Sequence, residues 1–552
     1  MFTYLTQKKS RFILFVILSI FYSALTAVIA LVLASIIEAA TGDSMGVLIQ
    51  VTLFASASII VYTIMQYVYA RVKNSILLDA KVQLKNDLFS SIMKKDVVAF
   101  ETKNSAAYIN DLTTNVNMVE TLTFENIFQL INLTVSFTIA VAITVYFQPI
   151  LLLIMIVLGF VSFFSTKITN KGIEDLSKAI SDTAQQYQVG IKESFSGFKV
   201  IKSFQIINAI INIHNANNHL MEDKKIIHKM KMTFIGCSGM LVGFLSTVII
   251  MAVAAGLSIR GFISIGAVFA VGHLMGQVTS PIHALPQIIS NFKSARPICD
   301  ELMELMKPSP VQKNIQRFDE LKNAVEIKNV DFSYGDADVF KKTNLTIKRG
   351  KKYAVVGASG SGKTTLFSLL LGNYDNYKGN IQYDGKEIKE IEKDDIYNKI
   401  GVVYQDTFLF DDTLKNNITL YDNRFSEEEI MAAIYNAGLK EFVNNYPGLL
   451  DGQISENGKN ISGGERQRIN LARILLRKQN ILFLDELSSS LDNEKAVEIE
   501  TFLLSLKNIT LLTITHRINK DLLTQYDSII TIKNKQLVVF ESYEEAVKSG
   551  VI

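Results

Sequence analysis

The sequence predicts a bundle of six transmembrane helices followed by an α/β domain with a phosphate-binding loop. Six long apolar stretches lie within the first 282 residues, and helices of such length and composition are expected to span a bilayer. From Val325 onward, apolar and polar residues alternate as they do in half-buried strands. A glycine-rich stretch, residues 357–365, follows a short apolar segment and precedes an apolar helix, which is the setting of a phosphate-binding loop.

Length and composition agree with this division. The chain has 552 residues, too many for one hydrophobic core, so at least two domains are expected. Its net charge of +3 comes from 56 basic and 53 acidic residues, a balance that argues against nucleic acid as the main partner. The two cysteines, Cys237 and Cys299, lie far apart without metal-ligand spacing, so we expect free thiols and no disulfide.

Each apolar stretch can be bounded from the sequence. We predict transmembrane helices over residues 12–37, 47–70, 128–147, 150–165, 234–258 and 262–282. The first stretch follows basic residues, as a signal peptide does, but its apolar run is too long and no small-residue cleavage motif clearly ends it. Core helices of soluble proteins average about 11–12 residues, so six stretches of this length favour a multi-pass membrane protein.

The distribution of Lys and Arg predicts the orientation in the membrane. Basic residues are frequent in the N-terminal segment, in residues 71–125 and in residues 167–231. The connections at 41–46 and 148–149 contain none, and the last connection has only Arg260. Because cytoplasmic loops carry the excess of Lys and Arg, both termini and the two long segments are expected in the cytoplasm. These segments have helical periodicity, so the membrane helices should continue beyond the bilayer.

Prolines mark the boundary between the two parts. Pro308 and Pro310 follow the last apolar helical residues and break the helix. We therefore expect a transmembrane domain over residues 1–308, a linker over 309–324 and a nucleotide-binding domain over 325–552.

Residues 357–365 match the G-x-x-x-x-G-K-[ST] pattern of a phosphate-binding loop. Its glycines let backbone N–H groups approach a phosphate, and the following helix N-terminus adds unpaired donors and partial positive charge. Lys363 can pair with the β- and γ-phosphates of a nucleotide, and Thr364 can ligate Mg²⁺. The residues expected to contact the nucleotide in this loop are Gly357, Ser359, Gly360, Ser361, Gly362, Lys363, Thr364 and Thr365.

Polar residues end several of the other predicted strands. Gln405 offers a carboxamide that can bind Mg²⁺ or a water molecule. Asp485 can hold Mg²⁺ through water, the adjacent Glu486 can act as general base, and His516 can contact the γ-phosphate. Taken singly, such residues are more often solvated or structurally satisfied. Because ligands bind at the carboxyl ends of strands in open α/β sheets, the paired acids Asp485 and Glu486, in this order after the loop, favour a ligand site.

Two further segments can contact a nucleotide. Tyr334 ends a predicted strand and offers a ring that can stack on adenine, although a lone tyrosine there is more often ordinary packing. Ser462 is a natural helix N-cap, and Gly463 and Gly464 expose backbone amides behind it. Two glycines are costly as simple capping, so we favour phosphate contact for this helix start.

Together these motifs resemble the ATP-binding cassette (ABC) family, and the resemblance covers essentially the whole chain. Six spans with long internal loops ahead of one nucleotide-binding domain look like a half-transporter of the type IV exporter architecture. The resemblance implies an A-loop aromatic at Tyr334, a Walker A loop at 357–365, a Q-loop glutamine at Gln405, an X-loop acid at Glu456, a signature motif at 462–465, a Walker B motif ending in Asp485 and Glu486, a D-loop at 490–492 that brings Asp492 to the nucleotide, and a switch histidine at His516.

The sequence departs from the family pattern at a few positions. The signature motif has Ile461 and Glu465 where Leu and Gln are usual, which could weaken nucleotide contact slightly. The D-loop has Ser490 where Ala is usual, and the X-loop is only partly family-like. None of these changes removes a catalytic group.

The resemblance also implies a dimer. In this family the signature helix of one subunit contacts ATP held by the Walker A loop of the other, so two sites form at a head-to-tail interface. A homodimer and a heterodimer with a partner that carries a degenerate site are both compatible with this sequence. Short helices near residues 97–106 and 207–216 would press on the nucleotide-binding domains and carry their motion to the membrane helices.

The function implied is Mg-ATP-driven export of an amphipathic substrate, such as a peptide, lipid or drug, across a cell membrane, expected to be a bacterial plasma membrane. Two alternatives are a siderophore-type importer on the same fold and a nucleotide-gated channel or sensor, against which the retained Glu486 argues. Polar residues within the spans, including Gln129, Asn132, His273 and Gln277, either contact the substrate or hydrogen-bond between helices. Membrane lipids and a second half-transporter are the other partners expected.

Overall fold

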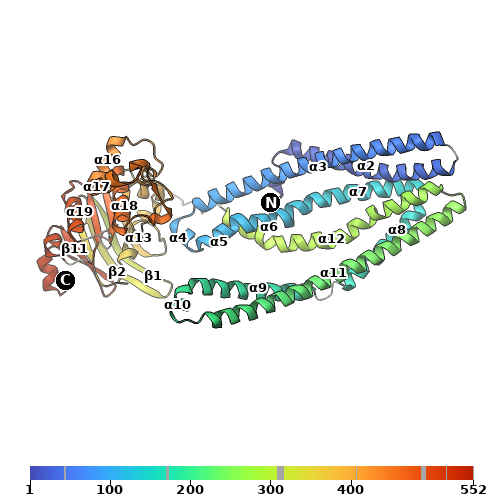
Figure 1. Cartoon of the computed structure of the whole chain (residues 1–552). Coiled ribbons are helices and arrows are strands. Elements are labelled where there is room, and N and C mark those ends of the chain that lie inside the picture. The colour runs from blue at the N-terminus through green and yellow to red at the C-terminus, as the bar shows by residue number, and fades with distance from the viewer. Residues whose placement is uncertain are drawn as a thin grey trace. The chain divides into compact units, whose positions relative to one another are not determined.

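The computed structural model describes residues 1–42, 45–169, 173–307, 316–405, 407–486, 493–516 and 519–550. The chain divides into two compact units, which are coloured along the chain in Figure 1. The first unit contains Met1–Lys95 and Lys103–Lys307, and the second contains Asp96–Thr102 and Pro308–Ile552. The second unit therefore includes one short segment from the first half of the chain.

In the described residues of the first unit, every element of secondary structure is a helix (Figure 1). Its long helices are α2 (Lys9–Thr41), α3 (Met45–Met93), α7 (Glu125–Phe147), α8 (Pro149–Thr169), α9 (Ile173–Ser196), α11 (Ile207–Ile259) and α12 (Ile265–Leu305). Its short helices are α1 (Phe2–Leu5), α5 (Ser105–Asn110), α6 (Val116–Val119) and α10 (Phe198–Ser203). Two π-helical turns, Asp111–Asn115 and Glu120–Phe124, join α5, α6 and α7 into one continuous helix.

The predicted bundle of membrane-spanning helices is confirmed. Among the described residues, five helices are long and apolar enough to cross a membrane, namely α2, α3, the continuous helix Ser105–Phe147, α11 and α12. The predicted fourth span lies in α8, whose shorter apolar part is Pro149–Val161. Helices α3, α11 and α12 have 49, 53 and 41 residues, well beyond the ~20 that cross the hydrocarbon core.

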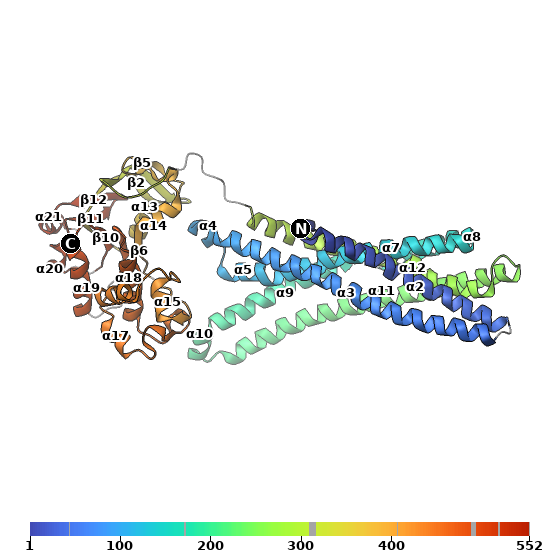
Figure 2. The same cartoon turned by 90° about the horizontal axis from the view of Figure 1, so that it is seen from above.

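Two apolar clusters hold the first unit together. One gathers buried side chains of α2, α3, α7 and α12 around Phe15, Leu84 and Phe128, and the other joins α7, α8, α11 and α12 around Met155 and Leu274. Both views show α2 alongside α3 (Figures 1 and 2). Many large apolar side chains on the same helices are exposed, as expected for helices whose outer faces meet lipid rather than water.

Two short helices are expected in the internal segments. The structure has the first within its predicted range and the second at a different position. Helix α4 (Val97–Glu101) lies within the predicted range 97–106 and belongs to the second unit, where Lys393 Nζ lies 2.9 Å from an oxygen of Asp96. The second prediction was misplaced, because residues 207–216 begin the long helix α11 while the short helix is α10. The break falls at Gln205, whose φ of 54° is left-handed, and no glycine or proline at that position marked it in the sequence.

The second unit contains two main sheets. Strands β1 (Ala324–Tyr334), β2 (Ala337–Lys348), β4 (Lys378–Tyr383) and β5 (Lys386–Glu387) form an antiparallel sheet in the order β2-β1-β4-β5. The larger sheet has the order β12-β11-β3-β10-β9-β6. Its strands are β3 (Lys352–Val356), β6 (Ile400–Val403), β9 (Ile481–Asp485), β10 (Thr510–Ile514), β11 (Ser528–Lys533) and β12 (Gln536–Phe540). The short strands β7 (Asp412–Thr413) and β8 (Gln453–Ile454) pair with each other.

Helices accompany the larger sheet, as the predicted α/β domain requires (Figure 2). They are α13 (Lys363–Leu370), α14 (Lys393–Lys399), α15 (Leu414–Thr419), α16 (Glu427–Asn436), α17 (Lys440–Asn445), α18 (Gly463–Arg477), α19 (Asn493–Ser505), α20 (Lys520–Leu523) and α21 (Tyr543–Lys548). Alternate residues of β3 enter different cores: Ala354 and Val356 join one apolar cluster, whereas Tyr353 and Val355 join the other. This two-sided burial is the pattern expected of a central parallel strand.

The register of the parallel strands positions the candidate site. Strand β10 lies between β3 and β9, and its residue Ile514 is opposite both Val355 and Asp485. Strand β6 runs parallel to β9 on its other side. The carboxyl ends of β3, β6, β9 and β10 therefore share one edge of the sheet, where ligands of open α/β sheets bind.

Candidate functional site

The loop after β3 has a backbone that only glycine adopts readily. Gly360 and Gly362 have φ values of 77° and 107°, in the left-handed region. A Cβ at Gly362 would lie 2.7 Å from Val339 Cγ1, so a side chain is excluded there by contact as well as by conformation. Ser359 and Gly360 are exposed, and the loop leads directly into the N-terminus of α13.

Lys363 places a buried positive charge across this loop. Its Nζ donates to the carbonyl oxygens of Gly357 at 3.0 Å and Ala358 at 2.9 Å. Burial lowers the pKa of Lys363, while the nearby carboxylates of Glu486 and Asp485 act in the opposite direction. The ammonium group is thus held beside the loop amides with two carboxylates nearby.

The residues of the loop fit a bound phosphate. Ser361 Oγ is buried and has no hydrogen-bond partner among the described residues, which is the condition expected of a group that a ligand satisfies. The exposed backbone at Ser359 and Gly360, the start of α13 and the ammonium of Lys363 add donors and positive charge. This combination suits the polyphosphate of a nucleotide.

Thr364 and Asp485 form a pair of oxygen donors beside the loop. Thr364 Oγ1 donates to Asp485 Oδ2 at 3.0 Å. Burial raises the pKa of Asp485, and the bond from Thr364 opposes that rise. No group of three acidic, histidine or cysteine side chains among the described residues forms a metal cage. A hydroxyl and one carboxylate nevertheless fit Mg²⁺, which binds few protein ligands and shares its shell with phosphates and water.

The Glu486 carboxylate contacts two of the other predicted site residues. Its Oε2 accepts from Gln405 Nε2 at 3.0 Å, and its Oε1 lies 2.8 Å from His516 Nε2. The Glu486 N–H donates to Ile514 O, and its φ of 51° turns the chain sharply after β9. Residues that follow β6, β9 and β10 thus meet at one carboxylate. Such a group can orient a water molecule and accept its proton.

Tyr334 lies at the end of β1 and is 44% exposed. The ring packs edge-on against Phe332 and Tyr374, at centroid distances of 4.9 and 5.4 Å, and its hydroxyl donates to Thr365 Oγ1 at 3.3 Å. Burial and a hydrogen bond with Tyr334 raise the pKa of Tyr374 to about 12. Sequence patterns do not single out Tyr374, because it lies in a connection without periodic patterning.

The Ser462 turn begins α18 with a reciprocal cap. Ser462 Oγ accepts from the Glu465 N–H at 3.3 Å, and Glu465 Oε2 accepts from the Ser462 N–H at 2.7 Å. Glutamate and glutamine both supply this oxygen, so Glu465 preserves the helix start. Within the described ranges, no hydrogen bond or ion pair joins this turn, including Gly463 and Gly464, to the 357–365 loop. Asp492 lies outside the described residues.

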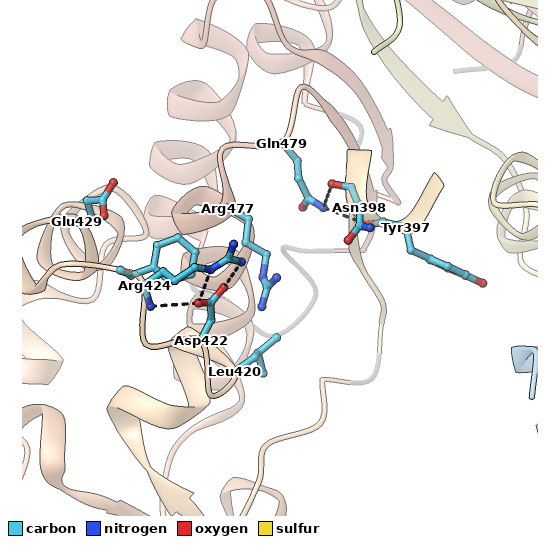
Figure 3. A pocket seen from close by; sticks show the side chains of 9 residues that line it. Tyr397, Asn398, Leu420, Asp422, Arg424, Glu429, Arg477 and Gln479 are labelled. Atoms are coloured by element: carbon cyan, nitrogen blue, oxygen red, sulfur yellow. Dashed lines mark hydrogen bonds and ion pairs between the residues drawn. The ribbon is translucent and has the colours of Figure 1, made fainter. Parts of the chain in front are cut away.

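The described part of the second unit contains several hollows, of which two bear on the candidate site. One of about 690 Å³ is lined by Tyr397, Asn398, Leu420, Asp422, Arg424, Phe425, Glu429, Arg477 and Gln479 (Figure 3). It contains none of the predicted nucleotide contacts, and Arg424 is already bonded to Asp422 through two nitrogens, at 2.9 and 2.7 Å. A second hollow of about 450 Å³ is lined by both Gln405 and Gly463. The smaller hollow is therefore the one that adjoins the candidate site.

Known proteins resemble the chain over both units. A family model described as "ABC transporter transmembrane region" matches residues 12–282, and one described as "ABC transporter" matches residues 340–489. An ATP-dependent lipid A-core flippase of Photobacterium profundum is 27% identical over 474 residues, which cover 85% of this chain and 80% of the relative. An uncharacterised ABC transporter ATP-binding protein of Bacillus subtilis is 28% identical over 520 residues, which cover 92% and 89%.

The fold also matches a solved structure. A bacterial Atm1-family ABC exporter with ATP bound superposes with a TM-score of 0.85 at 19% sequence identity. The match covers 98% of this chain and 96% of that one. At this identity the likeness establishes the fold shared by the two chains.

Proposed function

Because this chain belongs to the ABC transporter family, we propose that it hydrolyses ATP to move an amphipathic substrate, such as a peptide, lipid or drug, out of the cytoplasm or the inner leaflet. One observation carries the ATPase assignment. The Glu486 carboxylate is held between Gln405 and His516 at the sheet edge that also bears the phosphate-binding loop. The lipid A-core flippases among the relatives support an amphipathic substrate.

The residues of the site have different proposed roles in hydrolysis. ATP with Mg²⁺, when bound, supplies the phosphoryl group whose hydrolysis releases free energy. Lys363 and the loop amides hold the phosphates, while Thr364, Asp485 and Gln405 are the candidates for the Mg²⁺ shell. Glu486 accepts the proton of the attacking water at its carboxylate.

The remaining proposed nucleotide contacts come from two chains. Tyr334 stacks on the adenine ring, and His516 contacts the γ-phosphate. In the proposed dimer, Ser462, Gly463, Gly464 and Asp492 complete the site of the opposite subunit, since Ser462 and Gly463 form the N-terminus of α18 and helix N-termini favour phosphate. The partner is a second copy of this chain or a related half-transporter.

Removing the Tyr334 ring tests its role. We expect Tyr334→Ala to raise the KM for ATP by about tenfold, because base–aromatic stacking contributes ~1–3 kcal/mol, while kcat changes little. Tyr334→Phe should behave like the wild type, since its ring remains. The measurement is steady-state ATPase activity with ATP as the varied substrate. An unchanged KM in Tyr334→Ala would remove the ring from nucleotide binding.

The direction of transport is tested in inside-out membrane vesicles, in which ATP added outside reaches the nucleotide-binding domains. The distribution of Lys and Arg supports cytoplasmic termini, and the short external connections leave little room for a delivery protein to dock. With a labelled phospholipid and an amphipathic dye as probes, Mg-ATP should drive a probe into the lumen, and Glu486→Gln should not. Release of preloaded probe on ATP addition would identify an importer.

A gated channel or sensor is the second candidate from another class. It predicts ion conductance that ATP opens, without a requirement for hydrolysis. Single-channel recording with the Glu486→Gln protein separates the two, because a channel that binding opens would still conduct.

A further inference from the structure

Arg473 is a buried charged side chain that the nucleotide contacts above leave unexplained. It lies on α18, the helix that begins at the Ser462 turn, and is only 9% exposed. Burial lowers its pKa to about 10. A buried guanidinium is costly unless its donors are paired, so its partners show what the protein gains by placing it there.

Those partners belong to a different segment of the chain. Arg473 Nε donates to Asn417 O at 2.7 Å, Nη1 donates to Phe408 O at 2.9 Å, and Nη2 donates to Asn417 Oδ1 at 3.2 Å. Asn417 is fully buried on α15, a helix that packs against α18. One planar guanidinium therefore holds α15 and the chain at Phe408 at the same time.

Asn417 extends this network along the segment that precedes α15. Its Nδ2 donates to Phe410 O at 2.9 Å and to Thr413 O at 3.1 Å, and its Oδ1 accepts from the Phe410 N–H at 2.9 Å. Most of these bonds are made to backbone groups. They therefore fix the path of the chain from Phe410 to Thr413 against α15, and Arg473 attaches this network to α18.

The segment held by Arg473 begins close to the candidate site. Phe408 follows Gln405 by three positions, and Gln405 Nε2 donates to Glu486 Oε2. Gln405 is thus bonded to a carboxylate at the sheet edge, and Phe408 is bonded to α18. Gln405 and Gly463 also line the same hollow of about 450 Å³.

We propose that Arg473 is a positioning residue that couples the Gln405 segment to the Ser462 turn, so that both move together when Gln405 changes partner during nucleotide turnover. This inference rests on the proposed function, because both ends of the coupled unit are proposed nucleotide contacts. The coupling depends on the two-pronged geometry of the guanidinium. A lysine at this position keeps the charge but bonds Phe408 and Asn417 less completely with a single nitrogen.

Arg477 provides a matched control on the same helix. It is the same residue type one turn further along α18 and is exposed. Among the described residues, its side-chain hydrogen bond is a long one, from Nη2 to Thr419 O at 3.5 Å. Arg477→Met is the same chemical substitution as Arg473→Met and removes the same charge. It leaves the hydrogen bond from Arg473 to Phe408 O intact.

The first test compares the two variants in the full-length protein in lipid vesicles. We expect Arg473→Met to lower kcat by about tenfold or more while its affinity for a fluorescent ATP analogue stays within about twofold. Arg477→Met should keep both values, and Arg473→Lys should fall between them. Parallel loss of nucleotide affinity, kcat and melting temperature in Arg473→Met would overturn the proposal, since Arg473 would then only hold the domain together.

The second test asks whether Arg473 acts through Gln405. In a Gln405→Ala background the link has already lost its contact with Glu486, so adding Arg473→Met should lower kcat by less than about twofold more. If Arg473→Met costs the same factor in both backgrounds, it acts independently of Gln405 and the proposal is overturned. The proposed function is judged separately, by whether the wild type hydrolyses ATP and Glu486→Gln does not.

Discussion

Replacing Glu486 with Gln should reduce steady-state ATP hydrolysis by roughly 10²-fold or more, as expected for loss of a general base. The carboxamide has nearly the shape of the carboxylate but cannot accept the proton of the attacking water. It keeps one oxygen as an acceptor for Gln405 or His516, the two groups that hold the carboxylate in the structure. The phosphate-binding loop is unchanged, so ATP should remain bound.

The variant should therefore accumulate as an ATP-bound closed dimer. Phosphate release, binding of a fluorescent ATP analogue and cross-linking between subunits, measured on one preparation, report turnover, occupancy and closure separately. Glu441→Gln is a suitable control, because it makes the same chemical change at an exposed position on α17. Hydrolysis by Glu486→Gln near the wild-type rate would mean that another group accepts the proton.

The convergence of Gln405, Glu486 and His516 was accessible from sequence for a physical reason. Each ends a short apolar segment, and parallel strands in one sheet bring their carboxyl ends to one edge. The register of β10 with β3 and β9 places these ends level. Local pattern and this rule of sheet geometry explain why the three strand ends meet, while the family resemblance supplied the grouping of the residues and their proposed roles.

Other features depend on contacts between distant segments, which local patterns do not encode. In the sequence, Arg473 looks like any other basic residue of its helix. Its burial results from the packing of α15 against α18. Tyr374 acquires its place from contact with Tyr334. The true position of α10 depends on a left-handed residue, Gln205, that is neither glycine nor proline. The proposed contact of the Ser462 turn with a nucleotide involves a second chain, so it does not follow from local patterns within one subunit either.

The second subunit of the proposed dimer is the basis of the other large expected effect, a loss of hydrolysis in a Ser462 variant. Ser462→Arg places a long cation at the exposed start of α18, where the proposed dimer receives the phosphates of the partner's nucleotide. We expect it to reduce hydrolysis by roughly 10²-fold, since preorganised donors at a phosphate site contribute at this level. ATP binding to the subunit's own loop should survive, because the Ser462 turn makes no hydrogen bond or ion pair with residues 357–365 in the described chain. Lys363→Ala should instead lose ATP binding itself, because it removes the buried ammonium of the loop.

Mixing the two inactive variants tests whether sites are shared between subunits. In a mixed dimer, one site combines the altered Lys363 loop with the altered Ser462 turn, and the other combines an intact loop with an intact turn. ATPase activity should therefore reappear when differently tagged Ser462→Arg and Lys363→Ala subunits are co-expressed and the mixed dimers are purified through both tags. Dimers of either variant alone serve as the inactive controls. If each site were built within one subunit, both sites of the mixed dimer would be defective. Purified mixed dimers without activity would therefore contradict a head-to-tail arrangement in which the two sites work independently.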